Sequence, residues 1–364
     1  MDNSSDSEFF QEVELLRQQL QSAALPERLL KRAEAMLDRL KLMAKFGFYS
    51  QEFEQISRYV DWITALPWQI RTEDILDLDY ASQKLNETHY GLQEIKDRIL
   101  EYIAVMKLKS DKLKAAQGEI TPEDRQDFMR APILFFVGLV GTGKTTIAKS
   151  IAAAMGRKFA RIPFGGMSDP LTLRGQSRVR PDAEVGQVLK AIRRVGVKNP
   201  VILLDEIDRV SEHTRGDIMG VLVELLDPGQ NHAFVDHFVD FPFDLSEVLF
   251  IATANNTHSI ATAVLDRMEV IRMPSYTDDE KIHIGRDYVL PKVRRQAGLD
   301  DDQLTIADDV WPLIVRPLGF DAGIRTLERN INAIARKVAR QVVEGKITGL
   351  HITTDNVKPY LPTW

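Results

Sequence analysis

The sequence predicts an α/β fold in which a parallel sheet is flanked by helices, preceded by a helical hairpin region and followed by a small, mostly helical domain. Short apolar runs lie at residues 133–137, 201–204, 248–253 and 270–273, and all but the last are almost continuous. Such runs are typical of parallel strands that are covered on both faces. Helical stretches separate most of them, as in a doubly wound sheet, and a glycine-rich loop follows the first run.

The N-terminal region, residues 1–75, is predicted to be helical. Apolar residues recur at helical spacing over residues 10–20 and 29–40, and Pro26 stands where a helix can begin without losing a hydrogen bond. A third helix is predicted over residues 51–65. We interpret the region as a helical hairpin for packing or assembly.

The C-terminal region, residues 276–364, has a different texture and is predicted to be a small helical domain. Acidic residues follow Thr277, which favours the start of a helix there. A long helix is predicted over residues 324–343 and a short strand at residues 351–354. The central α/β domain then occupies residues 76–275.

The composition excludes several classes of protein. The chain has no cysteine, which rules out disulfides, thiolate metal sites and thiol nucleophiles. No apolar run is long enough to span a membrane, and the acidic N-terminus is unlike a secretory or mitochondrial leader. A net charge of −6 does not match the basic surface of most nucleic-acid-binding proteins. We therefore expect a cytoplasmic protein with no membrane partner, and nucleic acid is a less favoured partner.

The glycine-rich loop at residues 138–145 matches the G-x-x-x-x-G-K-[ST] pattern of a phosphate-binding loop. Its glycines let backbone N–H groups turn inward around phosphate oxygens, and the helix that follows directs its N-terminal dipole at the same anion. Lys144 would contact the β and γ phosphates, and the hydroxyl of Thr145 would bind Mg²⁺. The alternative is a glycine-rich turn with a solvated lysine. The predicted cofactors are ATP and Mg²⁺, and the residues predicted to bind nucleotide here are Gly138, Gly141, Thr142, Gly143, Lys144, Thr145 and Thr146.

Two acids follow the second apolar run. Asp205 stands at the tip of this strand, where its carboxylate would hold Mg²⁺ together with Thr145. Glu206 would orient the water that attacks the γ-phosphate. Acidic residues often begin a loop, but a phosphate loop upstream makes the catalytic interpretation the favoured one.

Further segments extend this pattern beyond the phosphate loop. Residues 201–206 are accompanied by Leu-Phe-Ile-Ala-Thr-Ala-Asn at 249–255 and Leu-Asp-Arg-Met-Glu at 265–269. Further matches lie at residues 59–68, 89–91, 198–200, 226–228, 234–237 and 323–329. Together these segments resemble the AAA+ ATPases and, more narrowly, the ATPase module of the Lon protease family, over roughly residues 11–361. The resemblance implies a P-loop AAA+ sheet.

The resemblance also implies roles for residues outside the phosphate loop. Asn255 matches the family's first sensor, although an asparagine after a strand can simply form a turn. Arg267 matches the arginine finger that reaches the nucleotide of a neighbouring subunit, the alternative being a surface salt bridge with Asp266 or Glu269. Arg325 matches the second sensor, carried on the C-terminal domain, and a solvated arginine is its alternative.

Two further residues and the assembly state follow from the same resemblance. His89 and Tyr90 resemble the family's adenine-side contacts, and a structural His-Tyr pair before a helix is the alternative. An arginine finger that acts between subunits implies a ring, which by resemblance is a homohexamer.

Two departures from the family pattern alter the expected function. No stretch resembles the family's serine–lysine peptidase motif or its N-terminal substrate-recruiting domain, so we expect no peptidase activity from this chain alone. The family's first pore loop carries an aromatic residue followed by an aliphatic one, whereas the matching stretch at 173–182 has Arg180 and Pro181. Arginine favours acidic or phosphate groups over an unfolded chain of any sequence. The other residues that could provide the grip are Phe164, Met167 and Val179.

The sequence therefore predicts an Mg²⁺-dependent ATPase that unfolds or remodels unfolded or damaged protein clients, in or alongside ATP-dependent proteolysis. The peptidase would be part of a longer chain or a separate protein. One alternative is a nucleotide-gated regulatory or assembly module without threading activity. Another is a nucleic-acid remodeller that uses Arg174, Arg178 and Arg180 in its pore.

Overall fold

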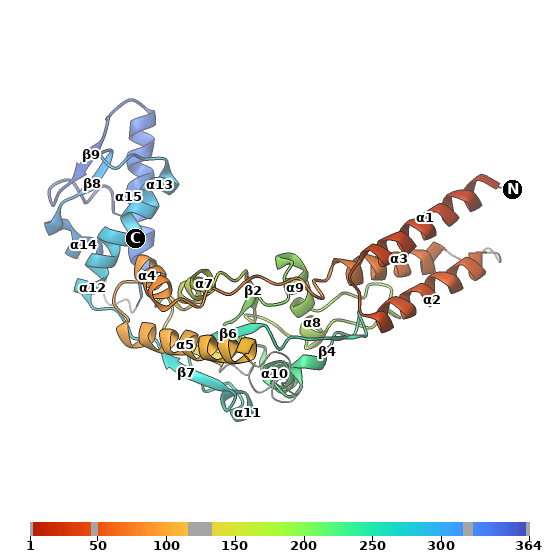
Figure 1. Cartoon of the computed structure of the whole chain (residues 1–364). Helices are drawn as coiled ribbons and strands as arrows, with labels where there is room; N and C mark the ends of the chain where they lie inside the picture. Colours follow the sequence, from red (N-terminus) through yellow and green to blue (C-terminus); the bar gives the residue numbers. More distant parts are fainter. Residues whose placement is uncertain (1–2, 45–49, 116–132, 316–322, 362–364) are drawn as a thin grey trace.

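The centre of the molecule is a sheet of five parallel strands in the order β2-β3-β6-β1-β7. The structure, a computed structural model, describes residues 3–44, 50–115, 133–315 and 323–361 (Figure 1). The strands are β1 (Ile133–Val137), β2 (Phe159–Pro163), β3 (Val201–Asp205), β6 (Leu249–Ala254) and β7 (Met268–Arg272). The predicted fold class is confirmed, and the four predicted strands are present with ends shifted by at most two residues.

The apolar pattern missed strand β2, which forms one edge of the sheet. Its residues alternate in burial, with Ala160 and Ile162 buried and Arg161 exposed. An edge strand has a partner on one side only and can carry polar residues, so it shows no continuous apolar run. By contrast, β1, β3 and β6 are buried along their whole length.

Different helices cover the two faces of the sheet. On β1, Phe135 packs into one hydrophobic cluster and Leu134 and Phe136 into another, because successive strand residues point to opposite faces. The helices around Phe136 are α4 (Leu78–Thr88), α5 (Gln93–Ala115) and α7 (Lys144–Ala154). The helices around Phe135 include α9 (Gln187–Val195) and α10 (Arg215–Leu226).

Short elements form the loops around this sheet. Among the described residues they are α8 (Leu171–Arg174), α11 (Thr262–Leu265), the 3₁₀ turns η1 (Ile207–Arg209), η2 (Glu212–Thr214) and η3 (Asn231–Ala233), and an antiparallel ribbon of β4 (Phe234–Val235) and β5 (Pro242–Phe243).

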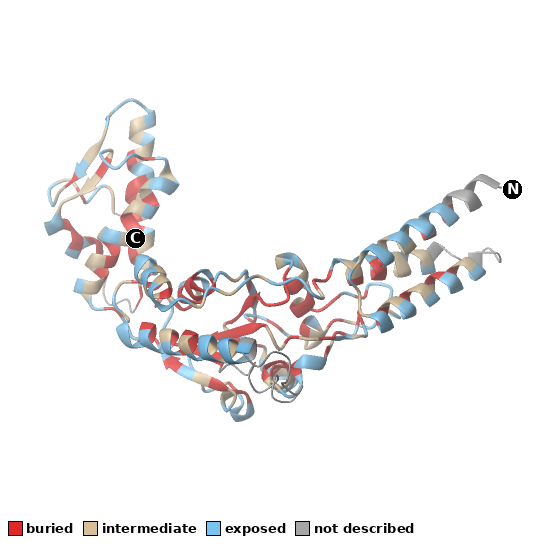
Figure 2. Cartoon of the chain, in the orientation of Figure 1, coloured by how far each residue is buried: buried red, intermediate tan, exposed pale blue. Residues whose placement is uncertain are grey.

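The N-terminal region consists of α1 (Asn3–Ser22), α2 (Glu27–Ala44) and α3 (Ser50–Ala65), as the spacing of its apolar residues predicts. α1 and α2 extend away from the sheet as a pair, and Figure 2 shows that buried residues alternate with exposed ones along them. Their buried residues join the same cluster as Phe135, so this region shares a core with one face of the sheet. Within the part of the chain that the structure describes, no helix combines the length and the apolar character that crossing a membrane requires.

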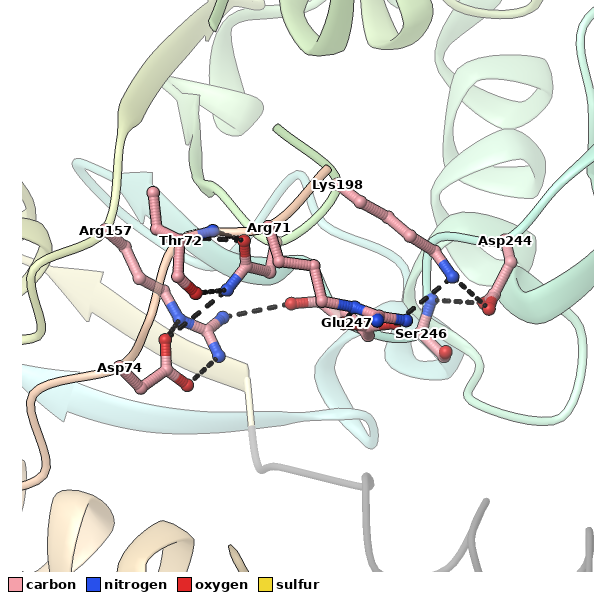
Figure 3. Close-up of polar contacts among 9 residues, drawn as sticks. Arg71, Thr72, Asp74, Arg157, Lys198, Asp244, Ser246 and Glu247 are labelled. Atoms are coloured by element: carbon pink, nitrogen blue, oxygen red, sulfur yellow. Dashed lines mark hydrogen bonds and ion pairs between the residues drawn. The ribbon is translucent and has the colours of Figure 1, made fainter. Parts of the chain in front are cut away.

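A network of ion pairs fastens the segment between α3 and α4 to the sheet (Figure 3). Arg71 contacts the carboxylate of Glu247 through two nitrogens, at 2.6 and 2.7 Å, and Lys198 contacts Glu247 at 3.1 Å. Arg157 makes a similar two-point contact with Asp74 at 2.7 and 2.6 Å. These paired contacts are specific in geometry, so the connecting segment follows a defined path.

The C-terminal region has its own hydrophobic cluster around the fully buried Trp311. Its first helix begins as predicted, because Thr277 and Glu280 form a reciprocal capping box. The predicted long helix is present as α15, and the predicted C-terminal strand is β9, which pairs in parallel with β8. The elements are α12 (Asp278–His283), the π-helical turn η4 (Ile284–Val289), α13 (Leu290–Ala297), β8 (Leu304–Ile306), η5 (Asp308–Val310), α14 (Trp311–Val315), α15 (Arg325–Val343) and β9 (Leu350–Ile352).

Candidate functional site

The glycine-rich loop joins β1 to α7 at the carboxyl end of the sheet. Gly141 and Gly143 have φ values of 86° and 95°, a backbone conformation that residues with a side chain rarely adopt. At Gly138 a Cβ atom would lie 2.7 Å from the carbonyl oxygen of Met273, so only glycine fits beside the end of β7. The glycines are therefore required by the shape of the loop.

Lys144 is buried inside this loop, with 8% of its surface exposed. Its Nζ donates to the carbonyl oxygens of Gly138 at 2.6 Å and Leu139 at 2.9 Å, and to Oδ1 of Asn255 at 3.2 Å. Burial lowers the pKa of its ammonium, while the nearby carboxylates act in the opposite direction. Lys144 and the predicted sensor Asn255 are thus in direct contact at the ends of adjacent strands.

Groups of the C-terminal region donate hydrogen bonds to backbone carbonyls of the glycine-rich loop. The N–H of Ile324 donates to the carbonyl of Gly141 at 3.1 Å, and the hydroxyl of Tyr276 donates to the carbonyl of Thr142 at 3.1 Å. A Cβ on Gly323 would lie 2.5 Å from the Gly141 backbone, so these two segments of the chain touch without a side chain between them.

His89 contacts the first turn of α7, directly after the loop. It is 6% exposed, and its Nδ1 and Nε2 contact the hydroxyls of Thr88 at 2.9 Å and Thr146 at 3.1 Å. Burial, helped by the charge of Lys96, lowers the pKa of His89 to about 4, so the ring is neutral at physiological pH. Both ring nitrogens are used within the chain, which favours a structural role over the predicted adenine contact.

Tyr90 faces the C-terminal region rather than His89. Its ring stacks on His283 with centroids 5.1 Å apart and planes 12° from parallel, and it packs against the cluster around Trp311. The two residues predicted to contact adenine are therefore adjacent in sequence but have different partners.

The predicted metal ligands lie together. Oγ1 of Thr145 is 3.5 Å from Oδ1 of Asp205. The hydroxyl of Thr253 also donates to Oδ1, while Nε of Arg161 donates to Oδ2 at 2.6 Å. A hydroxyl and one carboxylate oxygen, beside a loop shaped for phosphate, are the hard oxygen ligands that Mg²⁺ uses when phosphates and water complete its shell. The residues present fit Mg²⁺, and when bound it would neutralise charge on the phosphates.

Glu206 adopts a left-handed backbone conformation with φ of 59°, and its N–H donates to Oγ1 of Thr253 at 3.0 Å. Its Oε2 lies 3.2 Å from the position that a Cβ on Gly165 would take, and 3.8 Å from Nη1 of Arg209. A non-glycine residue in this conformation is unusual. This conformation places the carboxylate of Glu206 beside the carboxyl end of β3, close to the loop after β2.

Three residues of this site were not predicted: Arg161, Thr253 and Asp208. Arg161 and Thr253 hold the two oxygens of Asp205 in place. Asp208 accepts the backbone N–H of Asn255 through Oδ2 at 3.1 Å, and thereby links the turn after β3 to the predicted sensor. Asp208 was visible in the sequence as the second acid after β3. The contacts of Arg161 and Thr253 depend on strand order, which no motif encodes.

The two predicted arginines have different surroundings. Arg325 begins α15, and its Cγ lies 3.3 Å from the position of a Cβ on Gly141, so its charge is close enough to lower the pKa of Lys144. Arg267 lies apart from the phosphate loop and donates to Oδ2 of Asp227 at 2.9 Å and to the carbonyl of Ala263 at 2.7 Å. Its ion-pair partner is therefore neither Asp266 nor Glu269, and Glu269 pairs with Arg98 instead.

The loop at residues 173–182 presents Val179 and Pro181 to solvent. Val179 is 88% exposed, whereas Phe164 and Met167 are buried in the core and cannot contact a client in this conformation. Of the three arginines, Arg174 pairs with Glu224, and Arg178 lies 3.8 Å above the ring of Tyr59. Arg180 is exposed.

Comparison with known proteins agrees with this geometry. Residues 134–276 match the model of the ATPase family associated with various cellular activities (AAA), and residues 295–350 match the Lon protease AAA+ ATPase lid domain. The chain is 45% identical to the Lon protease of Dictyoglomus thermophilum over 351 residues, which cover 96% of this chain and 42% of that protein. It is 43% identical to Lon protease 2 of Thermus thermophilus, covering 96% of this chain and 43% of the relative. The Lon protease of Lawsonia intracellularis is also 43% identical, with 40% of its length covered.

The sheet order, the phosphate loop and the acid pair at the end of β3 together define an AAA+ ATPase domain, which binds nucleotide. The matched lid and the relatives narrow this class, and the chain belongs to the Lon family as its ATPase region. It spans about two fifths of the length of the curated relatives that it matches, and the matched part is the ATPase rather than the peptidase.

Proposed function

We propose that this chain hydrolyses ATP with Mg²⁺ and uses the cycle to unfold or remodel protein clients, in or alongside ATP-dependent proteolysis. The observation that carries the proposal is the convergence of Lys144, Thr145, Asp205 and Asn255 at the carboxyl ends of β1, β3 and β6. Lys144 would bind the β and γ phosphates, and Thr145 with Asp205 would hold the metal. Nucleotide sites of α/β sheets lie at this edge.

Asn255 and Glu206 are the proposed groups around the attacking water. The side chain of Asn255 already contacts Lys144, so its amide is within reach of a γ-phosphate bound by that lysine. Glu206 lies one residue beyond the metal ligand Asp205 and would orient the water. Arg325, at the start of α15, would respond to the nucleotide from the C-terminal side.

Arg267 is proposed to act on a neighbouring subunit. It lies away from the phosphate loop of its own chain, and Asp227 holds its guanidinium near the surface. Such an arginine is useful only if subunits meet, so we propose a homo-oligomeric ring, with six copies as the family resemblance implies. The proposed domains are residues 1–75, 76–275 and 276–364, and the proposed location is the cytoplasm.

The exposed Val179 supports a protein client over a nucleic acid. An apolar side chain that is 88% exposed at a loop tip offers contact area to an unfolded polypeptide. The nucleic-acid alternative is weakened because Arg174 and Arg178 already pair with Glu224 and Tyr59. The alternative of a nucleotide-gated module without threading is favoured only by Arg180 and Pro181, which replace the family's aromatic and aliphatic residues.

The test is steady-state ATP hydrolysis with Mg²⁺, measured with and without casein as an unfolded client. We expect hydrolysis that casein stimulates and that Glu206→Gln and Arg267→Ala abolish. Glu206→Gln should still bind ATP, while Lys144→Met should not. Hydrolysis that ignores casein would refute the remodelling function and leave a nucleotide switch. Hydrolysis that survives Arg267→Ala at full rate would refute the ring.

A further inference from the structure

Asp236 is a fully buried carboxylate outside the nucleotide site, with 0% of its surface exposed. Its Oδ2 accepts the N–H of Gly186 at 2.7 Å, and its Oδ1 accepts the N–H of Phe238 at 2.8 Å and of Val239 at 3.2 Å. Burial raises the pKa of this carboxyl, and the three backbone donors act in the opposite direction. A buried carboxylate is costly unless its partners are held in position, so these contacts require explanation.

The first partner segment is the loop between Gly175 and Gly186, whose two ends meet beside Asp236. A Cβ on Gly186 would lie 2.1 Å from the carbonyl oxygen of Leu173, and one on Gly175 would lie 2.6 Å from Oδ1 of Asp236. Gly175 also has a φ of 77°. The N–H of Gln176 donates to the carbonyl of Glu184 at 2.8 Å, which closes the next step of the loop. Its base is therefore a tight backbone junction that only glycines can form.

The second partner segment is the loop at residues 236–240, which follows β4 (Figure 1). The N–H of Asp240 donates to the carbonyl of Asp236 at 2.7 Å, and the N–H of His237 donates to the carbonyl of Arg174 at 2.7 Å. The carboxylate of Asp240 lies 4.0 Å from Arg178 in the first loop. The two loops, about 50 residues apart in sequence, thus share contacts at both the base and the side.

The first loop is also fixed to the N-terminal helices. Nη2 of Arg58 on α3 donates to the carbonyl of Ala183 at 2.7 Å, and Arg178 lies above the ring of Tyr59 on the same helix. What remains free is the tip, where Val179 is 88% exposed. The base of the loop is therefore held by contacts on both sides, and only the residues around Val179 extend into solvent.

We propose that Asp236 is a positioning residue that joins the loops at 175–186 and 236–240 into one unit, so that the exposed tip around Val179 meets a client polypeptide from a fixed place. The joining of the loops rests on these contacts and does not depend on the proposed function. The consequence for clients rests on the proposed function. Asparagine in place of Asp236 keeps the shape of the side chain but has only one acceptor oxygen, because its second terminal group is an N–H₂ donor. It therefore cannot accept all three backbone N–H groups together.

The absence of cysteine from the chain allows a clean test. A nitroxide attached to Asp182→Cys, at the exposed tip, reports the mobility of the first loop with Asp236 intact and in Asp236→Asn. We expect a restrained spectrum in the first case and a mobile spectrum in the second. The casein concentration that gives half-maximal stimulation should rise about tenfold, as the loss of a hydrogen bond to a charged group implies. The KM for ATP and the basal rate should not change. The corresponding change of a carboxylate to an amide at the exposed Glu212, Glu212→Gln, is the matched control. It should change neither the nitroxide spectrum nor the casein concentration for half-maximal stimulation.

A second measurement needs no substitution at Asp236. If one carboxylate holds both loops, the amides of Gly186, Phe238 and Val239 should exchange their hydrogens in one cooperative opening. Independent exchange of these amides, or an unchanged nitroxide spectrum in a folded Asp236→Asn protein, would overturn the proposal. Lack of casein stimulation with Asp236 intact would instead refute the proposed function. The nitroxide spectrum and the amide hydrogen exchange would still test whether Asp236 joins the two loops.

Discussion

Replacing Arg161 by methionine should weaken the proposed Mg²⁺ site without much effect on the fold. Nε of Arg161 donates to Oδ2 of Asp205 at 2.6 Å, and this side chain is 52% exposed while that of Asp205 is 5% exposed. The other oxygen, Oδ1, faces Thr145 and Thr253. Without Arg161 the carboxylate loses the contact that fixes its rotation, so Oδ1 no longer stays directed at the metal position.

The expected effects differ in size. A half-exposed ion pair contributes little to stability, so the free energy of unfolding should fall by about 1 kcal/mol. Residues that orient a metal ligand have a larger effect on the metal, and their loss lowers affinity by about 10- to 100-fold. The Mg²⁺ concentration needed for half-maximal nucleotide-dependent activity should therefore rise by roughly that factor.

The assay is a Mg²⁺ titration of fluorescent ATP-analogue binding and of hydrolysis, with nucleotide binding in EDTA as the reference. Arg98→Met is the matched control, because Arg98 is 54% exposed and pairs with Glu269 at 2.9 Å on the far edge of the sheet. If Arg161→Met needs no more Mg²⁺ than Arg98→Met, the orienting role of Arg161 is wrong. If both variants lose Mg²⁺ affinity equally, the effect is one of charge rather than of contact.

Three further changes test other parts of the structure. Lys198→Met removes the cation between Asp244 and Glu247, and should lower the unfolding free energy measured in urea by about 2 kcal/mol because these carboxylates are partly buried. An unchanged urea midpoint would show that the ion pairs of Lys198 in Figure 3 do not stabilise the fold. His89 has a pKa of about 4 when folded against an ordinary 6.5, so the unfolded chain takes up the proton first and stability should fall as the pH drops from 6.5 towards 4, by about 2 kcal/mol at pH 5. His89→Gln should flatten that dependence in denaturant titrations, and an equally steep decline would count against burial of a neutral ring. Val179→Ser should abolish stimulation by casein and keep basal hydrolysis. If Arg180→Ala abolishes the stimulation and Val179→Ser does not, the loop recognises charge instead.

Sequence motifs predicted the parts of the site in which a short segment determines its own geometry. The phosphate loop is one example, since the positive φ of Gly141 and Gly143 is a local requirement. The fold class was predictable for a similar reason, because β1, β3 and β6 are buried on both faces and read as apolar runs. Strand β2 at the edge lacks that pattern and was missed.

Contacts between segments distant in sequence were not predictable. Arg161 reaches Asp205 because β2 lies next to β3, and Thr253 reaches it because β6 lies on the other side. The partner of Arg267 was sought among nearby acids, but the fold brings Asp227 to it from 40 residues away. The roles of the sensors and the finger depend on distances of this kind, and they stay predictions until the variants above are measured.

The junction between the phosphate loop and α15 has a mechanical consequence. The peptide of Gly141 directs its carbonyl at the N–H of Ile324 at 3.1 Å, immediately before a helix of 19 residues. A helix of that length extends about 28 Å, so a rotation of about 10° at its first residue carries its far end through about 5 Å. The start of α15 is joined to the loop by this hydrogen bond and by the close contact of Gly323 with Gly141. A change in the loop too small to alter the sheet would therefore be visible as a large displacement at Val343, which is 89% exposed and open to a neighbour.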